Sequence, residues 1–489
     1  MDPIANTPIR CYRHPHRGLT TLRIILCLLL LLIAPSAFAF QRDVITRALE
    51  VTGFSKTGDR VLHWHDAQGI EQNYQSAPPF VSIPYSREAW FDPESGVERS
   101  NAVSVYPGSG PGKPAVSLLT PGGVFFMRDT VAVPIAGPVG ERNLNLWAVL
   151  SDWRNADDVR ALGDQVYAGY PRTVLARTGE FGEERLFLDP KSGFPVKLER
   201  EEPHYLWGQV RVEFTYQIWR QSGNALLPTA VSRVVDGFKE IARTIGDFEF
   251  IDRASAPDLK IPAASPAGRT PIFLQPVATK KVEISAKTFL SVNTGYTEAI
   301  TLIGDTIYIL DSTQGEERAK QDFELIHTTF PGPHPIILVV TDLAWPHIAG
   351  IRFWVAQGAT VISHRTSRDF LTRIVGRRWT LNPDLLEKRR NTVKFKFSPI
   401  DKEQALSGGK LRLSAIDGIG TEGSLMAYLP DDQLLWASDF IQNVIRPATY
   451  TTEVWQAVQR AGFVPRRVAA MHIPLTDWSK IEAIVKALN

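Results

Sequence analysis

The sequence predicts an α+β protein of two domains, in which an antiparallel β-domain precedes a domain of alternating strands and helices. Three observations support this organisation. The 489 residues exceed what one hydrophobic core usually holds. A stretch rich in Pro and Ala and without periodicity, residues 254–276, separates two patterned regions and is interpreted as a linker. Upstream, apolar residues alternate with a period of two, whereas downstream strand-like and helix-like segments alternate.

The composition is that of an ordinary globular chain. Hydrophobic residues make up 44% and charged residues 22% of the sequence, which argues against wholesale disorder. The formal net charge is +2, and nucleic-acid binding usually requires a strong basic excess on one face. We therefore expect no nucleic-acid partner.

The first 39 residues have the pattern of a signal peptide. Four arginines precede an unbroken apolar run from Ile24 to Ala34, and small residues follow at Ala37 and Ala39. The alternative is a membrane anchor, but a spanning helix needs about 20 apolar residues and this run is shorter. We therefore expect cleavage after Ala39, no stable membrane span afterwards, and export to the periplasm or the extracellular space.

Removal of this leader would also remove both cysteines of the chain, Cys11 and Cys27. The mature protein would then have no disulfide, no thiol nucleophile and no thiolate metal ligand. Any metal site must therefore use imidazole and carboxylate groups.

Residues 40–253 are predicted to form the antiparallel β-domain. The pattern is poor up to about Asn145, apart from a short helix near 45–51 and two apolar strands around the turn at Pro121. From Asp164 onward, segments with period-two alternation are separated by turns such as residues 189–193, which is typical of a meander with one buried face.

Three of these segments, ERLFLDPKSGFPVKLE, GQVRVEFTYQIW and LLPTAVSRVVDG, resemble the open half-barrel of LolA/LolB-type proteins. In that family a curved sheet cups a helix and often a lipid chain. The resemblance covers about 90 residues and carries no catalytic motif. It implies a small molecule or an envelope lipid as the partner of this domain.

Residues 277–489 are predicted to alternate between strands and helices, which favours sheets layered with helices. The expected strands and hairpins are 302–313, 335–342, 359–364 and 424–440, and the expected helices are 348–358, 451–462 and 479–488.

Five landmarks in this domain resemble the metallo-β-lactamase superfamily in their order and spacing. The family has a strand ending in Asp, the loop T-H-x-H-x-D-H-x-G-G, the loop H-T-x-G-S, a hairpin ending in G-D, and a last strand ending in His. The corresponding positions here are Asp311, the loop 341–350, the loop 420–424, Ser438-Asp439 and His472. The resemblance covers about 210 residues and implies an αββα sandwich.

The resemblance also implies two metal ions, but most of their ligands are replaced. The substituted positions are Asp342, Ala344, Pro346 and Gly420, and a single carboxylate at the first metal position cannot hold zinc against water. Three ligands of the second metal remain, namely His347, Asp439 and His472. Two imidazoles and one carboxylate form a legitimate zinc site with an open fourth position, so the remaining ligands allow one zinc ion, whereas a two-metal centre is not expected.

Two hypotheses for function follow from this eroded motif. In the first, the protein is a non-catalytic descendant that binds or scaffolds another molecule, with His347, Asp439 and His472 as ordinary loop, turn and strand-end residues and Trp345 filling the vacated pocket. In the second, it is a mononuclear zinc hydrolase of an ester, lactam or phosphoester, and Asp342 is the only candidate for a catalytic base.

A separate motif, His63-Trp64-His65-Asp66, has H-x-H spacing. On a strand this spacing places both imidazoles on one face, as a metal site would require. The alternative interpretation is a pair of polar residues on an edge strand.

Overall fold

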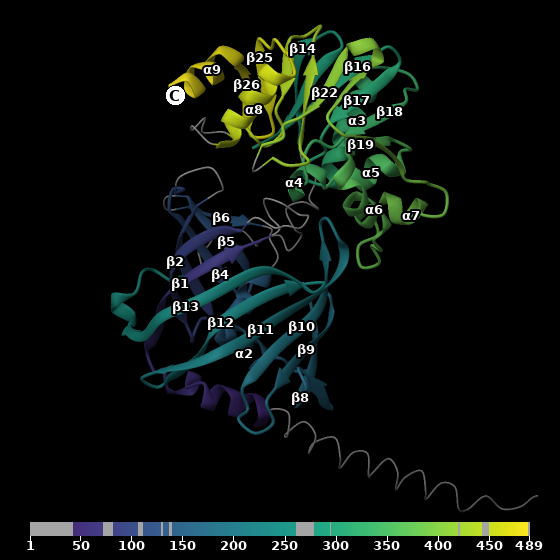
Figure 1. Cartoon of the computed structure of the whole chain (residues 1–489). Coiled ribbons are helices and arrows are strands. Elements are labelled where there is room, and N and C mark those ends of the chain that lie inside the picture. The colour runs from purple at the N-terminus through teal and green to yellow at the C-terminus, as the bar shows by residue number, and fades with distance from the viewer. Residues whose placement is uncertain are drawn as a thin grey trace, which may run out of the picture.

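The computed structural model describes residues 43–71, 82–105, 111–128, 131–135, 139–260, 278–293, 295–418, 421–442 and 449–487 (Figure 1). The predicted signal peptide and most of the predicted linker lie outside these residues. Across the described part of the chain, the search for a helix of sufficient length and apolarity to cross a bilayer finds no candidate.

The N-terminal region forms one large antiparallel sheet. Its strands run in the order β6-β5-β4-β3-β2-β1-β13-β12-β11-β10-β9-β8-β7, so that neighbours along the chain are mostly neighbours in the sheet. The strands are β1 (Arg60–Ile70), β2 (Ile83–Asp92), β3 (Val97–Ser104), β4 (Ala115–Thr120), β5 (Gly123–Arg128), β6 (Val131–Ile135), β7 (Arg160–Tyr167), β8 (Tyr170–Gly179), β9 (Gly182–Leu188), β10 (Pro195–His204), β11 (Gly208–Ser222), β12 (Ala225–Val235) and β13 (Phe238–Asp252).

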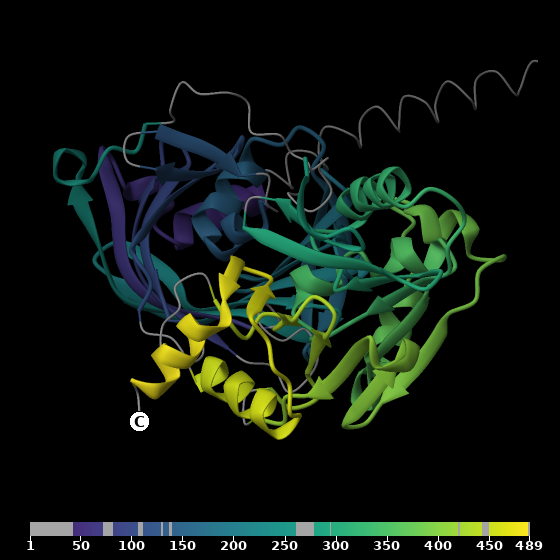
Figure 2. The same cartoon turned by 90° about the horizontal axis from the view of Figure 1, so that it is seen from above.

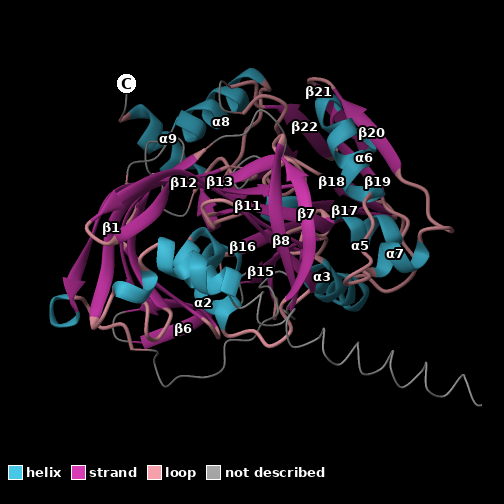
Figure 3. Cartoon of the chain, turned by 90° about the horizontal axis from the view of Figure 1, so that it is seen from below, coloured by secondary structure: helices cyan, strands magenta, loops and turns pink. Residues whose placement is uncertain are grey.

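The strands curve around helix α2 (Leu146–Arg154), as Figure 3 shows. Trp147 and Trp153 of this helix are buried in one core with inward residues of the strands, including Phe214 of β11. The helix begins at Asn145, whose side chain accepts hydrogen bonds from the first free backbone amides of the helix. The predicted meander is therefore confirmed as an antiparallel sheet. The region before Asn145, where the pattern was poor, contains the two strands expected around Pro121, β4 and β5, and adds β1, β2, β3 and β6.

The C-terminal region contains two further sheets. One has the order β14-β15-β16-β17-β18-β19-β20 and the other β21-β22-β23-β24-β25-β26. Their strands are β14 (Lys280–Ser285), β15 (Thr288–Asn293), β16 (Tyr296–Ile303), β17 (Thr306–Leu310), β18 (Ile336–Val339), β19 (Thr360–His364), β20 (Lys396–Ile400), β21 (Glu403–Leu406), β22 (Leu411–Ala415), β23 (Leu425–Leu429), β24 (Leu434–Trp436), β25 (Arg467–Ala470) and β26 (Ile473–Asp477).

The two sheets share one apolar core, to which Leu310 and Val339 contribute from the first sheet and Leu413 and Trp436 from the second. A second core lies between the first sheet and the helices α3 (Glu316–Thr329), α5 (Ile351–Ala356), α6 (Arg368–Gly376) and α7 (Leu385–Arg389). A third lies between the second sheet and the helices α8 (Thr449–Arg460) and α9 (Trp478–Lys486). Helices thus cover the outer faces of two stacked sheets, and Figure 2 shows the same arrangement from above.

The turn between β10 and β11 connects the two regions. Leu206 in this turn is buried in the core of the first C-terminal sheet, and the ring of Trp207 meets Phe370 of α6 edge-on at 5.3 Å between centroids. Arg377 donates hydrogen bonds to the carbonyl oxygens of Trp207 and Gln209. The β-domain is therefore held to the C-terminal domain by a hairpin packed against its helices.

Candidate metal centre

Three side chains from distant parts of the sequence meet in the C-terminal domain. His347 lies in the short helix α4 (Trp345–Ile348), which follows β18, while Asp439 follows β24 and His472 joins β25 to β26. One donor atom from each lies within 4.8 Å of the others. The structure thus brings together the three residues expected from the sequence to bind one zinc ion.

The carboxylate of Asp439 stands between the two imidazoles. Its Oδ1 atom lies 3.2 Å from Nε2 of His472 and 3.8 Å from Nε2 of His347. The side chain of His347 is fully buried and that of His472 is 22% exposed. The cluster is therefore shielded behind His347 and accessible on the side of His472.

His347 is oriented from behind by Asp342. Both carboxylate oxygens of Asp342 lie 2.7 Å from Nδ1 of His347, and among the described residues Nε2 of the same ring has no hydrogen-bond partner. A carboxylate at Nδ1 keeps that nitrogen protonated, so Nε2 is the nitrogen that can bind a metal ion once its own proton is displaced. The unpartnered Nε2 faces Asp439, as a metal ligand would.

Asp342 is itself fixed on both oxygens. Its Oδ1 accepts a hydrogen bond of 2.7 Å from the backbone amide of Ala344, and its Oδ2 accepts one from the hydroxyl of Ser438. The role of Asp342 as a catalytic base stays a prediction. Its contacts give it the geometry of a positioning residue for His347.

His472 and Asp439 have their own supports. Nδ1 of His472 lies 2.6 Å from the carbonyl oxygen of Gly295, which turns Nε2 of that ring toward Asp439. The ring of Tyr296 meets His472 edge-on at 5.0 Å between centroids. The side-chain amide of Gln442 donates to the carboxylate of Asp439. Each of the three candidate ligands is therefore oriented by a second contact.

The electrostatic environment favours a cation at this position. Burial opposes a charge on His347, but the neighbouring carboxylates of Asp342 and Asp439 outweigh it and raise the pKa of His347 to about 9. Burial likewise opposes ionisation of Asp342, but the adjacent His347 outweighs it and lowers the pKa of Asp342. In the protein without a metal ion, the positive charge that these carboxylates attract is the proton of His347.

Asp311 is linked to the same site through Thr341, although it is not a candidate metal ligand. Its carboxylate accepts hydrogen bonds from the amide of Thr341 and from the indole of Trp436. Burial and the nearby charge of Asp342 raise the pKa of Asp311 to about 7. The sequence identified Asp311 as the landmark that ends a strand, and the structure shows that it holds the start of the 341–350 loop.

The positions that lost their ligands contribute no replacement among the described side chains. Ala344 is buried and carries no donor atom. The side chains of Trp345 and Pro346 and the whole of Gly420 lie outside the described residues, so the expectation that Trp345 fills the pocket remains a prediction. Sequence reasoning missed Ser438 as a support of Asp342, and the only signal for it was its place beside Asp439.

The comparisons with known proteins give a fold likeness only. No protein-family model matches the chain, and no curated protein matches it. Among the solved structures that resemble part of it are metallo-β-lactamases.

Three of these structures illustrate the likeness. The enzyme from Pontibacter korlensis is 15% identical with a TM-score of 0.32, and the match covers 43% of this chain and 99% of that one. FIM-1 from Pseudomonas aeruginosa, in its mono-zinc form, is 13% identical with a TM-score of 0.33, covering 44% and 96%. The enzyme from Hirschia baltica is 12% identical with a TM-score of 0.32, covering 43% and 96%.

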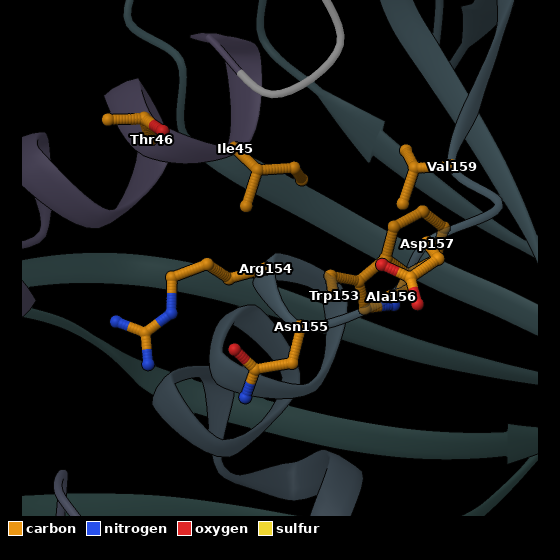
Figure 4. A pocket seen from close by; sticks show the side chains of 8 residues that line it. All are labelled: Ile45, Thr46, Trp153, Arg154, Asn155, Ala156, Asp157 and Val159. Carbon is orange, nitrogen blue, oxygen red and sulfur yellow. The ribbon is translucent and has the colours of Figure 1, made fainter. Parts of the chain in front are cut away.

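A pocket of about 360 Å³ lies in the β-domain. None of the three candidate metal ligands, His347, Asp439 and His472, lines it. It is formed between a helix at residues 43–51 and the end of α2, and Figure 4 shows its lining of Ile45, Thr46, Trp153, Arg154, Asn155, Ala156, Asp157 and Val159. The indole nitrogen of Trp153 has no hydrogen-bond partner among the described residues. The volume of this pocket and its mixture of polar and apolar lining residues suit a small ligand.

Proposed function

We propose that the C-terminal domain is a mononuclear zinc-dependent hydrolase of metallo-β-lactamase type, with the metal held by His347, Asp439 and His472. The observation that carries this proposal is the Nε2 atom of His347, which is buried, unpartnered and directed at Asp439. Buried polar atoms normally have partners, and one left without a partner beside two other metal-ligand atoms is well suited to a cation.

The donor set supports a catalytic rather than a structural metal. Structural zinc sites use four protein ligands, whereas catalytic sites use three and keep one position open. Bound here, zinc would act as a Lewis acid on the carbonyl or phosphoryl oxygen of an ester, lactam or phosphoester. The chain itself orients the ligands: Asp342 fixes His347, the carbonyl oxygen of Gly295 fixes His472, and Gln442 holds Asp439.

One ion rather than two is proposed. The first-metal position of the family pattern retains only Asp342, and this carboxylate is directed at Nδ1 of His347. Ala344 offers no ligand atom. Binding of a second ion by Asp342 would therefore break the hydrogen bond that orients His347, a ligand of the first ion.

A binding or scaffolding role is the second candidate. It is favoured by the observation that Asp342, the carboxylate expected to act as a base, has both oxygens occupied by protein donors. In that role the β-domain, with its pocket at Trp153, would receive a small molecule or an envelope lipid. Both roles assume an exported protein, as the first 39 residues predict.

Metal content tests the shared premise of a metal centre. The chain is purified without added metal, loaded with zinc, desalted and analysed for bound zinc by mass spectrometry. A His472→Ala variant should lose the ion of this centre, while His334→Ala should retain it, because His334 lies in an exposed loop bound to the carbonyl oxygen of Asp305. Equal zinc in the wild type and in His472→Ala would overturn the proposal.

Turnover separates the two candidates. The zinc-loaded protein is assayed against an ester, a lactam and a phosphodiester, with His472→Ala and His334→Ala in parallel. Hydrolysis that disappears only with His472→Ala supports the hydrolase. Stoichiometric zinc without hydrolysis of any of the three classes supports the binding role instead.

A further inference from the structure

We propose a second metal site, on the outer face of the β-domain, formed by His63 and His65 of β1 and Glu88 of β2. It uses none of the residues of the C-terminal centre and does not depend on the proposed hydrolase function. One ligand atom from each of the three side chains lies within 4.8 Å of the others. Figure 1 shows β1 and β2 next to each other in the sheet.

The alternation of β1 places the two histidines on the same face. Leu62 and Trp64 point into the core around α2, so His63 and His65 point to the opposite face. Glu88 is the direct cross-strand partner of His65 in the register of β1 and β2. The three side chains therefore share one face because of the pleat and the register alone.

The donor atoms converge on a single oxygen. Oε1 of Glu88 lies 3.1 Å from Nε2 of His63 and 3.7 Å from Nε2 of His65, and the two imidazole centroids are 5.1 Å apart. A simple ion pair would require one histidine near the carboxylate. Here two imidazole nitrogens and one carboxylate oxygen face a common point, which is the arrangement of a three-ligand metal site.

The site is partly fixed before any ion binds. The ring of His63 stacks on Trp90 at 5.3 Å between centroids and an interplanar angle of 16°. Trp90 is itself packed with Val61 and Leu259 in a small apolar cluster on this face. Because this packing limits the rotamers of His63, less conformational entropy is lost when an ion is bound.

A further carboxylate stands beside the cluster. Glu249 on β13 is paired with His63, and its Oε1 atom lies 3.9 Å from Nδ1 of that ring. A carboxylate at the second nitrogen of a metal-binding histidine holds the ring and increases its basicity. Glu249 thus adds negative charge beside His63, but at 3.9 Å it does not hydrogen-bond to the ring as Asp342 does to His347.

The alternative of a polar pair on an edge strand does not hold for these residues. β1 lies inside the sheet, hydrogen-bonded to β2 on one side and to β13 on the other. Charged side chains that protect a free strand edge are not needed there. Two histidines and a carboxylate suit zinc and similar borderline divalent ions. Because His65 is 64% exposed, the ion would exchange readily with solvent.

Zinc titration of the full-length protein tests the site in a background that removes the C-terminal centre. Metal-free His472→Ala protein is titrated with zinc in a calorimeter, and the titration is repeated on His65→Ala/His472→Ala and on the matched control His334→Ala/His472→Ala. We expect one zinc equivalent in the first and third proteins and the loss of that equivalent in the second. His65 is exposed and His334 is partly exposed in a loop, so neither substitution should disturb folding.

A second measurement keeps the site testable if His472→Ala fails to fold. His65→Ala alone should bind one zinc equivalent fewer than the wild type, whatever the C-terminal centre binds. Zinc binding that is unchanged by His65→Ala in either background overturns the second site. If His472→Ala abolishes one equivalent and His65→Ala another, both centres are supported separately.

Discussion

The Nδ1 atom of His347 lies 2.7 Å from both carboxylate oxygens of Asp342, while Nε2 on the other side of the ring faces Asp439 without a hydrogen bond. In this pair Asp342, which the sequence suggested as a catalytic base, orients the imidazole of His347. On the β-domain, Glu249 lies 3.9 Å from Nδ1 of His63, too far for a hydrogen bond.

Replacing Asp342 should weaken metal binding at the C-terminal centre without removing a ligand. We expect Asp342→Ala to lower zinc affinity about 10- to 100-fold, because loss of a carboxylate behind a ligating histidine frees the ring and its tautomer. Asp342→Asn should lose less, since its carbonyl oxygen can still accept the proton of Nδ1. Affinity is measured by competition with a zinc chelator.

The control for this experiment is Asp401→Asn, which changes an exposed aspartate paired with Arg365. Zinc affinity should be unchanged there. An Asp342→Ala protein that is folded and binds zinc as tightly as the wild type would contradict the positioning role.

Replacing Gly208 should weaken the contact between the β10–β11 hairpin and the C-terminal domain. Gly208 has a positive φ of 69°, and a Cβ atom there would lie 2.2 Å from Cδ1 of Trp379. A left-handed residue with a side chain costs about 1–2 kcal/mol, and the clash adds overpacking of about 1–3 kcal/mol. The melting temperature of Gly208→Ala should fall accordingly.

Gly223→Ala provides the matched control for Gly208→Ala. Gly223 has a positive φ of 55° in the turn between β11 and β12, and a Cβ there meets nothing within 4 Å. It should show only the cost of the left-handed backbone. Equal losses for the two variants would show that the contact with Trp379 contributes nothing to stability.

His204 should make stability depend on pH. Burial and the nearby Arg233 lower the pKa of His204 to about 3, and its neutral Nδ1 accepts the backbone amides of Leu206 and Trp207. The unfolded chain has the ordinary value of 6.5 and takes up the proton first as pH falls. The contribution of His204 to stability is therefore complete above pH 6.5 and is lost as the pH falls toward 3. Over this range the free energy of unfolding should fall by at most about 1.4 kcal/mol per pH unit.

The test of His204 is the change in melting temperature between about pH 7 and about pH 5, compared with His204→Asn. Asparagine keeps an acceptor for the two amides and does not titrate, so the decrease should be smaller in the variant. The same decrease in both proteins would assign the pH dependence to other groups.

Replacing Arg352 should destabilise the C-terminal domain. Arg352 is 2% exposed, and its guanidinium forms an ion pair with Asp384. The guanidinium also donates hydrogen bonds to the carbonyl oxygens of Ile374, Val375 and Arg377. Removing one partner of a buried pair costs about 3–5 kcal/mol, because the other charge stays buried. Arg352→Met should lower the free energy of unfolding in urea by this amount.

Arg365→Met is the corresponding control, because Arg365 pairs with Asp401 at the surface, where both side chains are more than half exposed. An exposed pair contributes about 0–1 kcal/mol. If the two variants lose the same free energy, the buried network around Arg352 is not a determinant of stability.

Much of the secondary structure could be predicted from local patterns. The strands 336–339 and 360–364 and the helix 449–460 lie within or close to the expected segments, because each has an apolar periodicity of its own. The first six strands of the β-domain were missed apart from the hairpin at Pro121. They are mixed in character: inward residues of β1 and β2 pack into the core around α2, whereas buried residues of β3, β4 and β5 form a separate small cluster.

The sequence by itself determined which ligand types remain: His347, Asp439 and His472 are present, whereas three positions of the family pattern hold residues that cannot replace a histidine or an aspartate. It also placed His63 and His65 on one face of a strand. Only the tertiary structure decided that Asp342 serves His347, that Glu88 completes the second cluster, and that Leu206 is buried in the other domain. Ligand geometry depends on distances between elements far apart in the chain, and a local pattern carries no information about those distances.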